Sequence, residues 1–132
     1  MKSKYLLALG GLLSGGAVVL GAFAAHGLKH ILSSVMLDVF ATGVQYQLIH
    51  ALAILLCGIL LQLKLSPRSQ KYFALATICF IIGIFCFSGS LYALSLTGLT
   101  WFGPITPLGG IAFVLGWGLF VYASLQIKEV DQ

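Results

Sequence analysis

Four long apolar stretches fill almost the whole of this 132-residue chain and constrain its fold more than any other feature. They run approximately over residues 5–25, 42–63, 72–96 and 107–127. Each reaches or exceeds the roughly 20 residues that an α-helix needs to cross the hydrocarbon of a bilayer. Because lipid offers the backbone no hydrogen-bond partner, such segments fold as helices. The sequence therefore predicts an all-α polytopic membrane protein with four transmembrane helices in a bundle.

The composition excludes the main competing classes of protein. With 60% hydrophobic and 8% charged residues, the chain carries more apolar surface than a soluble core of this size can bury. Four crossings use up the length, so residues 1–132 are expected to form a single transmembrane domain with no soluble catalytic part. The formal net charge of +4 is not gathered into a basic patch, which argues against a nucleic-acid partner. The expected surroundings are the lipid bilayer.

The distribution of positive charge predicts the orientation. Lys2 and Lys4, followed by an apolar run, resemble the start of a signal peptide. The apolar run is longer than that of a typical signal peptide, so we expect it to be a true first span. Short loops that carry Lys and Arg stay on the cytoplasmic side. If all four spans cross, one side of the membrane holds all of these residues except Lys29: Lys2, Lys4, Lys64, Arg68, Lys71 and Lys128. Both termini are therefore predicted to be cytoplasmic.

The external segment between the first two spans, residues 26–41, mixes apolar with polar side chains. Its polar residues include Lys29, Ser33, Ser34 and Asp38. This pattern predicts a short interfacial helix between spans one and two. In the alternative, Ser33 or Ser34 caps a helix that continues into the second span and projects above the bilayer.

Small residues predict where helices approach one another closely. Gly11 and Gly15 form a GxxxG pair in the first span, and Gly21 lies on a small-residue face of the same helix. Gly109 and Gly116 are similar positions in the fourth span. All five glycines are predicted to pack against helices within or between protomers.

The third span has two faces that are each expected to pack against another helix. One carries Ser88 and Tyr92, and the nearly opposite face is formed by Cys79, Gly83, Cys86 and Ser90. Because a thin four-helix protomer cannot easily cover both, the pattern favours a homo-oligomer, with lipid contact as the alternative. The three cysteines lack CxxC spacing and are expected to be reduced and buried.

Polar residues inside the spans are predicted to converge in the outer leaflet. The candidate pocket residues are His26, Gln47, His50, Ser88, Tyr92 and Thr106. Helical phase places Gln47 and His50 on one face of the second span. Two interpretations stay open: a hydrogen-bond network that fixes the helix packing, and a pocket open to the external side. His50 is the leading candidate for a functional residue. Its imidazole is expected to face the bundle and to bond, directly or through a water, to at least one of four residues: Gln47, Ser88, Tyr92 or Thr106.

The start of the fourth span adds to this expectation. Thr106 and Pro107 read as an N-cap followed by proline at the first helical position. The unpaired N–H groups of that turn would then point toward the polar cluster, where an anion or a carbonyl could bind. The alternative is a rigid, tight connection.

Metal and haem chemistry is a weaker interpretation of the histidines. His26 and His30 have i, i+4 spacing, and His26 with His50 could on paper ligate a haem. No fixed zinc or haem motif accompanies them, so we predict no metal, no cofactor and no catalytic residue.

Four ordered motifs link the chain to a known family. They are GAFAAHGL at 21–28, TGVQYQ at 42–47 with HALA at 50–53, FSGSLY at 87–92, and GPITPLGG at 103–110 with Gly116-Trp117. These motifs resemble those of the YgdD-type family, a group of small membrane proteins with a domain of unknown function. The resemblance covers nearly the whole chain and implies a four-helix protein of the bacterial cytoplasmic (inner) membrane. It brings no established activity.

Three classes of function follow from these patterns. The first, which we favour, is a non-catalytic membrane component whose polar cluster is structural. The second is a protein that binds or transports a small molecule or lipid at an external pocket around His50, although no carboxylate lies within the spans to carry protons. The third is a redox protein that uses the histidines. The ligand, if there is one, is not specified by the sequence.

Overall fold

The computed structural model describes residues 2–128, and most of these residues lie in helices joined by short turns. The elements are α1 (Ser3–His26), η1 (Leu28–His30), α2 (Ser34–Leu60), α3 (Pro67–Gly83), η2 (Ile84–Ser88), α4 (Gly89–Thr97), η3 (Thr100–Phe102) and α5 (Ile105–Leu125). The segments α3, η2 and α4 follow one another without a break and form the third span. Four helical segments are long and apolar enough to cross a membrane. The predicted all-α, four-span fold is therefore confirmed.

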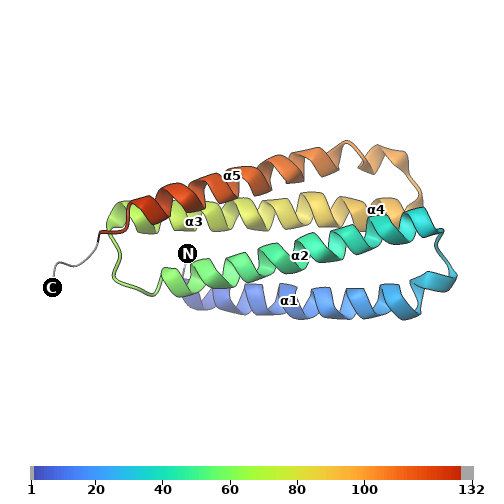
Figure 1. The fold of residues 1–132 in the computed structure, drawn as a ribbon, viewed down its shortest axis with the longest axis horizontal. Coiled ribbons are helices and arrows are strands. Elements are labelled where there is room, and N and C mark those ends of the chain that lie inside the picture. The colour runs from blue at the N-terminus through green and yellow to red at the C-terminus, as the bar shows by residue number, and fades with distance from the viewer. Residues whose placement is uncertain (1, 129–132) are drawn as a thin grey trace.

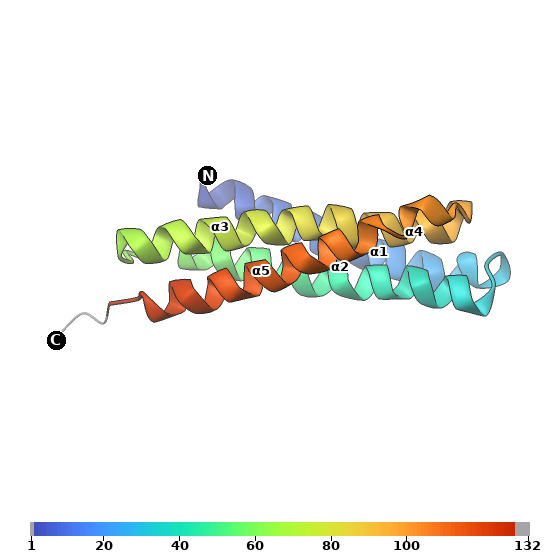
Figure 2. The same cartoon turned by 90° about the horizontal axis from the view of Figure 1, so that it is seen from above.

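The spans pack as two pairs around a central contact. α1 lies along α2, α5 lies along α3 and η2, and α2 meets α3, η2 and α4 between the two pairs. Figure 1 shows this order across the bundle, and Figure 2 shows α5 crossing in front of α3 and α2 at an angle. α1 and α5 each leave a broad face uncovered by protein, which suits helices that border lipid.

The main core forms where large apolar side chains of α2, α3 and α5 pack together in the middle of the bundle. Phe73, Phe80 and Ile54 are fully buried between α2, α3 and α5 and belong to the main core cluster. A smaller cluster forms around Phe40 and Leu28 at the end of the bundle that holds the α1–α2 connection. Membrane helices gain little from burying apolar groups that lipid would also cover, so tight packing of these shapes carries the stability.

The charged residues sort between the two ends of the bundle as the sequence predicts. The start of α1, the α2–α3 connection and the end of α5 lie at one end (Figure 1). We call it the lysine-rich end, because it carries Lys2, Lys4, Lys64, Arg68, Lys71 and Lys128. Ser66 caps α3 there by accepting a hydrogen bond from the Ser69 amide at 3.2 Å. Lys29 lies in η1 at the opposite end.

The connection between the first two spans differs from the predicted interfacial helix. Only a single 3-10 turn, Leu28–His30, forms there. Ser33 is the N-cap of α2, and its Oγ accepts a hydrogen bond from the Met36 amide at 3.2 Å. This bond satisfies one of the free N–H groups of the first turn. The second helix therefore begins directly after Ser33, as in the alternative in which Ser33 caps it.

The predicted start of the fourth span is also wrong in detail. α5 begins at Ile105 with Pro104 at the N-cap position, and no side chain caps it. The amide of Thr106 already donates to the carbonyl of Gly103 at 3.2 Å, because the preceding turn leads directly into the helix. Thr106 therefore lies inside the first turn and its hydroxyl is free to bond elsewhere.

Glycines set the close contact between the third span and α5. A Cβ atom at Gly109 would lie 2.7 Å from the Cα of Phe87, and one at Gly116 would lie 2.7 Å from ring atoms of Phe80. Gly83 in turn makes room for the ring of Phe113. α5 thus covers the small-residue face of the third span, and α2 covers the opposite face. Within the described residues, helices of the same protomer thus contact both faces of the third span.

The glycines of α1 behave differently from one another. Gly10 faces α2, where an added Cβ would crowd the side chain of Leu55, and a Cβ at Gly21 would make an ordinary contact with Val44 at 3.5 Å. Gly11 and Gly15 have no neighbouring atom within 4 Å of such a Cβ in the described part of the chain. The GxxxG pair therefore points away from the protomer.

Candidate functional site

A π-helical turn in the third span shapes the region around His50. It covers Ile84–Ser88, and the amide of Gly89 closes it by donating to the carbonyl of Ile84. A π turn inserts one extra residue into an α-helix and often occurs at functional sites. Here the backbone of Phe87 is the part that rests against Gly109 of α5. The turn therefore fixes both the approach of α5 and the position of the Phe87 side chain.

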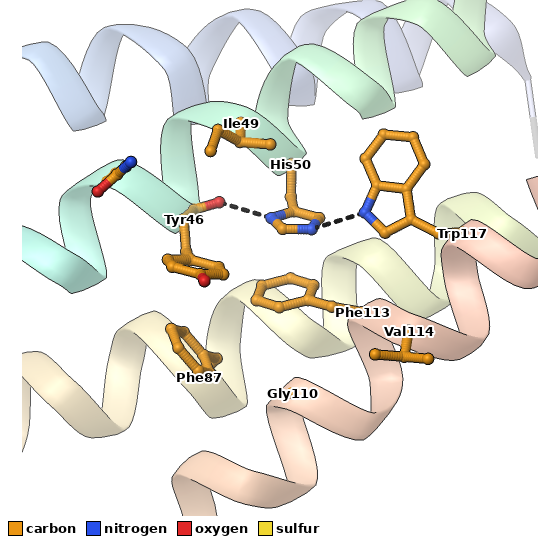
Figure 3. Close-up of a pocket in the computed structure, with 9 residues that line it drawn as sticks. Tyr46, Ile49, His50, Phe87, Gly110, Phe113, Val114 and Trp117 are labelled. Carbon is orange, nitrogen blue, oxygen red and sulfur yellow. Dashed lines mark hydrogen bonds between the residues drawn. The ribbon is translucent and has the colours of Figure 1, made fainter.

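A groove of about 460 Å³ opens between α2 and α5 above this turn. It is lined by Gln45, Tyr46, Ile49, His50, Phe87, Gly110, Phe113, Val114 and Trp117. Figure 3 shows α2 on one side, α5 on the other, and the rings of Tyr46, Phe87 and Phe113 between them. All nine residues lie inside helices, and Val114 is 72% exposed at the rim. The groove therefore opens on the side of the bundle, whereas the pocket interpretation of the sequence placed the opening on the external side.

His50 forms the polar end of the groove. Its Nδ1 lies 2.8 Å from the carbonyl oxygen of Tyr46, and the indole Nε1 of Trp117 donates to its Nε2 at 3.0 Å (Figure 3). A carbonyl can only accept and an indole N–H can only donate. Nδ1 must then carry the proton and Nε2 must be bare. Both bonds together select the neutral, Nδ1-protonated imidazole.

Aromatic stacking holds the ring of His50 in this orientation. Its centroid lies 3.5 Å from that of Phe113 with the planes 10° apart, and Phe80 packs against it at a centroid distance of 5.6 Å. The imidazole is only 3% exposed. The prediction that His50 faces the bundle is therefore confirmed, but its partners are Tyr46 and Trp117. Within residues 2–128, no direct hydrogen bond joins it to Gln47, Ser88, Tyr92 or Thr106.

The other predicted pocket residues form separate bonds between helices. Gln47 accepts a hydrogen bond from the Tyr92 hydroxyl at 2.7 Å and donates to the carbonyl of Leu13 at 2.9 Å, which ties α4, α2 and α1 together. Ser88 donates to the carbonyl of Gly43 at 2.7 Å. The hydroxyls of Ser90 and Thr106 lie 2.6 Å apart and join α4 to α5. These contacts fit the structural interpretation of the polar residues.

His26 does not join the site. It is the last residue of α1, its side chain is exposed, and it lies far along the bundle from His50. Among the residues that the structure describes, no group of three or more His, Cys, Asp or Glu side chains is arranged to hold a metal ion. His26 and His50 lie at different levels of the bundle, so their imidazoles cannot ligate one haem.

His50 also lies deeper in the membrane than the sequence suggests. The Tyr72 and Tyr122 rings meet edge to face at 4.6 Å beside Lys71, as aromatic residues do at a bilayer interface. Phe80, which contacts His50, lies roughly 12 Å from Tyr72 along α3. Thr97, at the other end of the third span, lies roughly 37 Å from Tyr72. If Tyr72 marks one boundary of a hydrocarbon core about 30 Å thick, His50 lies near the middle of that core, and Gln47, Ser88 and Tyr92 lie closer to the opposite boundary.

Trp117 is the residue of the site that sequence reasoning missed. It appeared only as part of the Gly116-Trp117 motif. A tryptophan in the middle of a transmembrane helix is a usable signal, because tryptophan in membrane proteins concentrates at the two interfaces. Its indole N–H needs a partner at this depth, and a histidine of another span is the natural candidate. Helical phase within one span could not reveal this bond.

The four long apolar helices define the class of the chain, a small four-span membrane protein. It belongs to the family described as "Protein of unknown function (DUF423)", which matches residues 20–110.

Three relatives show how far the similarity extends. A UPF0382 membrane protein of Haemophilus influenzae is 41% identical over 132 residues, which is 98% of this chain and 100% of the relative. The UPF0382 membrane protein YwdK of Bacillus subtilis is 42% identical over 93% of this chain and 98% of its own length. The UPF0382 inner membrane protein YgdD of Escherichia coli is 34% identical over 98% of this chain and 95% of its own length. The YgdD-type resemblance is thus confirmed, and no solved structure matches the chain.

Proposed function

We propose that this protein is a non-catalytic component of the bacterial cytoplasmic membrane that binds a neutral amphiphile of the bilayer in the α2–α5 groove. The observation that carries the proposal is the groove itself. Its volume of about 460 Å³ falls within the range of about 300–1,000 Å³ that small-molecule sites occupy. Because it opens sideways at membrane depth, a bilayer molecule can enter without passing through water.

The lining favours an apolar ligand without charge. None of the nine lining residues that the structure describes is acidic or basic apart from His50, whose two hydrogen bonds hold it neutral. An ionic group brought to this depth would have no counter-charge, which is costly in hydrocarbon. Tyr46, Phe87, Phe113 and Trp117 instead offer aromatic surface.

The same geometry supports a role in binding rather than catalysis. A general base needs a free lone pair within reach of a substrate proton. The one bare nitrogen of His50 is occupied by the Trp117 N–H at 3.0 Å. Among the described side chains packed around His50, only Tyr46 and Trp117 carry polar atoms, and the others are aromatic or aliphatic.

Filling the groove should abolish ligand binding. We expect a hexadecanol that bears a photoreactive diazirine to label wild-type protein in proteoliposomes at α2 and α5 lining residues. Gly110→Leu should reduce that labelling at least fivefold, because a Cβ at Gly110 meets only Phe87, at 3.9 Å, and the larger side chain then extends into the groove. Val114→Phe, introduced at the exposed rim, should have the same effect. Peptide mapping by mass spectrometry measures the labelled sites.

The matched control is Gly118→Leu on the same helix, where an added Cβ meets no atom within 4 Å. This variant gains the same side chain outside the groove and should be labelled like the wild type. Labelling spread evenly over lipid-facing positions such as Leu12 and Val121, and unchanged in Gly110→Leu, would refute a specific site.

For the orientation we propose that both ends of the chain face the cytoplasm. The support is the cationic lysine-rich end, since Lys and Arg in short loops are retained on the cytoplasmic side. Single cysteines at Arg68 and Lys29, in a variant without the three native cysteines, should react differently with a membrane-impermeant maleimide added to intact cells. Lys29→Cys should be labelled and Arg68→Cys should be protected. The reverse pattern would invert the topology.

Self-association remains a prediction from the sequence. Its support is now the outward-facing pair Gly11 and Gly15, since α5 and α2 cover both faces of the third span. Light scattering in detergent measures the mass of the particle. If both the wild type and Gly15→Leu have the mass of a single protomer, the prediction is wrong.

A further inference from the structure

The groove contains two polar groups that the fold does not use. Gln45 and Tyr46 line its outer part, and neither the Gln45 amide nor the Tyr46 hydroxyl makes a hydrogen bond to another described residue. The polar atoms at the inner part are occupied, because His50 and Trp117 bond to each other. Hydrogen bonds to a ligand are thus available from two adjacent residues of α2, both of which can donate.

These donors lie at hydrocarbon depth. The ring of Tyr46 packs against that of Phe87 at a centroid distance of 4.6 Å. Phe87 lies roughly 22 Å from the interfacial Tyr72 along the third span. In a hydrocarbon core about 30 Å thick, the donors are therefore about 8 Å inside the far boundary. A phosphate or ammonium head group would have to leave water to reach them, whereas a neutral carbonyl would not carry that penalty.

The walls between the donors and His50 are aromatic. Tyr46 and Phe113 lie nearly parallel, with centroids 6.1 Å apart and planes at 23°, and Phe87 lies 5.5 Å from Phe113 (Figure 3). Trp117 continues the same wall toward the lysine-rich end. Aromatic rings pair in offset-stacked or edge-to-face arrangements with their centroids 4.5–7 Å apart. The groove wall thus offers aromatic surface against which a flat ring can pack.

We infer that the groove binds the head group of a prenylquinone, a neutral, flat, carbonyl-bearing ring with a hydrocarbon tail. This inference rests on the proposed function and names its ligand class. The ring packs against the groove-facing sides of Tyr46, Phe87 and Phe113, and a ring carbonyl accepts a hydrogen bond from the Tyr46 hydroxyl, with the Gln45 amide as a second donor nearby. The tail leaves sideways past Val114 into the bilayer. The inference concerns binding and includes no electron transfer.

Quenching of Trp117 fluorescence tests this assignment. In a Trp101→Phe background, Trp117 is the single tryptophan of the chain, and Trp101 lies in η3, outside the groove. Decylubiquinone added to the full-length protein in detergent should quench Trp117 saturably. Tyr46→Phe removes one hydrogen bond and should weaken the apparent affinity about five- to tenfold.

The matched control is Tyr122→Phe, because Tyr122 is 39% exposed and Tyr46 is 38% exposed, yet Tyr122 lies at the lysine-rich end. It should leave the affinity unchanged. Quenching that rises linearly with quinone, without saturation, would overturn the inference. So would equal competition by decan-1-ol, but that result would leave the neutral amphiphile site intact. If diazirine labelling of the groove also fails, the proposed function itself is wrong.

Discussion

Replacing Gly109 with alanine should destabilise the bundle by about 3 kcal/mol, at the upper end of the usual cost of overpacking. The added Cβ would lie 2.7 Å from the Cα of Phe87. The obstacle is backbone within the π turn, which cannot rotate away as a side chain can. α5 must therefore move outward, and the contacts of Phe113 with Gly83 and His50 loosen with it. Unfolding by sodium dodecyl sulfate in mixed micelles measures the loss.

Gly118→Ala is the control for this prediction. Both glycines lie inside α5, so both substitutions gain the same helix propensity, up to about 1 kcal/mol. A Cβ at Gly118 meets no atom within 4 Å. This variant should be neutral or slightly more stable than the wild type. Equal stability of the two variants would show that Gly109 does not hold α5 against the π turn.

The bond between His50 and Trp117 should appear as an energetic coupling between two spans. His50→Leu leaves the indole N–H without its partner and removes a ring stacked on Phe113. An unsatisfied buried donor costs about 1–3 kcal/mol, and lipid cannot replace the partner. We therefore expect His50→Leu to cost about 2 kcal/mol. His50→Gln keeps an acceptor and should cost less.

A double-mutant cycle separates the hydrogen bond from the stacking. Trp117→Phe should destabilise the wild type more than it destabilises His50→Leu, because the second background has no bond left to lose. The expected difference is about 1 kcal/mol, near the values measured for polar contacts between membrane helices. Additive effects in the same mixed-micelle assay would mean that the 3.0 Å contact contributes nothing to stability.

Several features of this protein could be predicted because they are properties of single segments. The length of an apolar run decides whether it can span a membrane. The lysines identify the end of the bundle that holds the start of α1, the α2–α3 connection and the end of α5. The hydroxyls of Ser33 and Ser66 cap helices through bonds that reach only three residues ahead. The direction of His50 also follows locally, since an imidazole at this depth must avoid lipid.

What only the tertiary structure decided is which faces meet. The π turn at Ile84–Ser88 adds one residue, and one residue rotates a helix face by about 100°. The approach of α5 depends on Gly109, which meets a backbone that lies 22 positions earlier in the chain. These two features bring Trp117 to His50, 67 residues apart in sequence, and leave the groove open beside them. The length of an apolar run and the phase of its side chains are properties of one helix. The rotation of one helix relative to another, and the distance between them, are decided only when the helices pack.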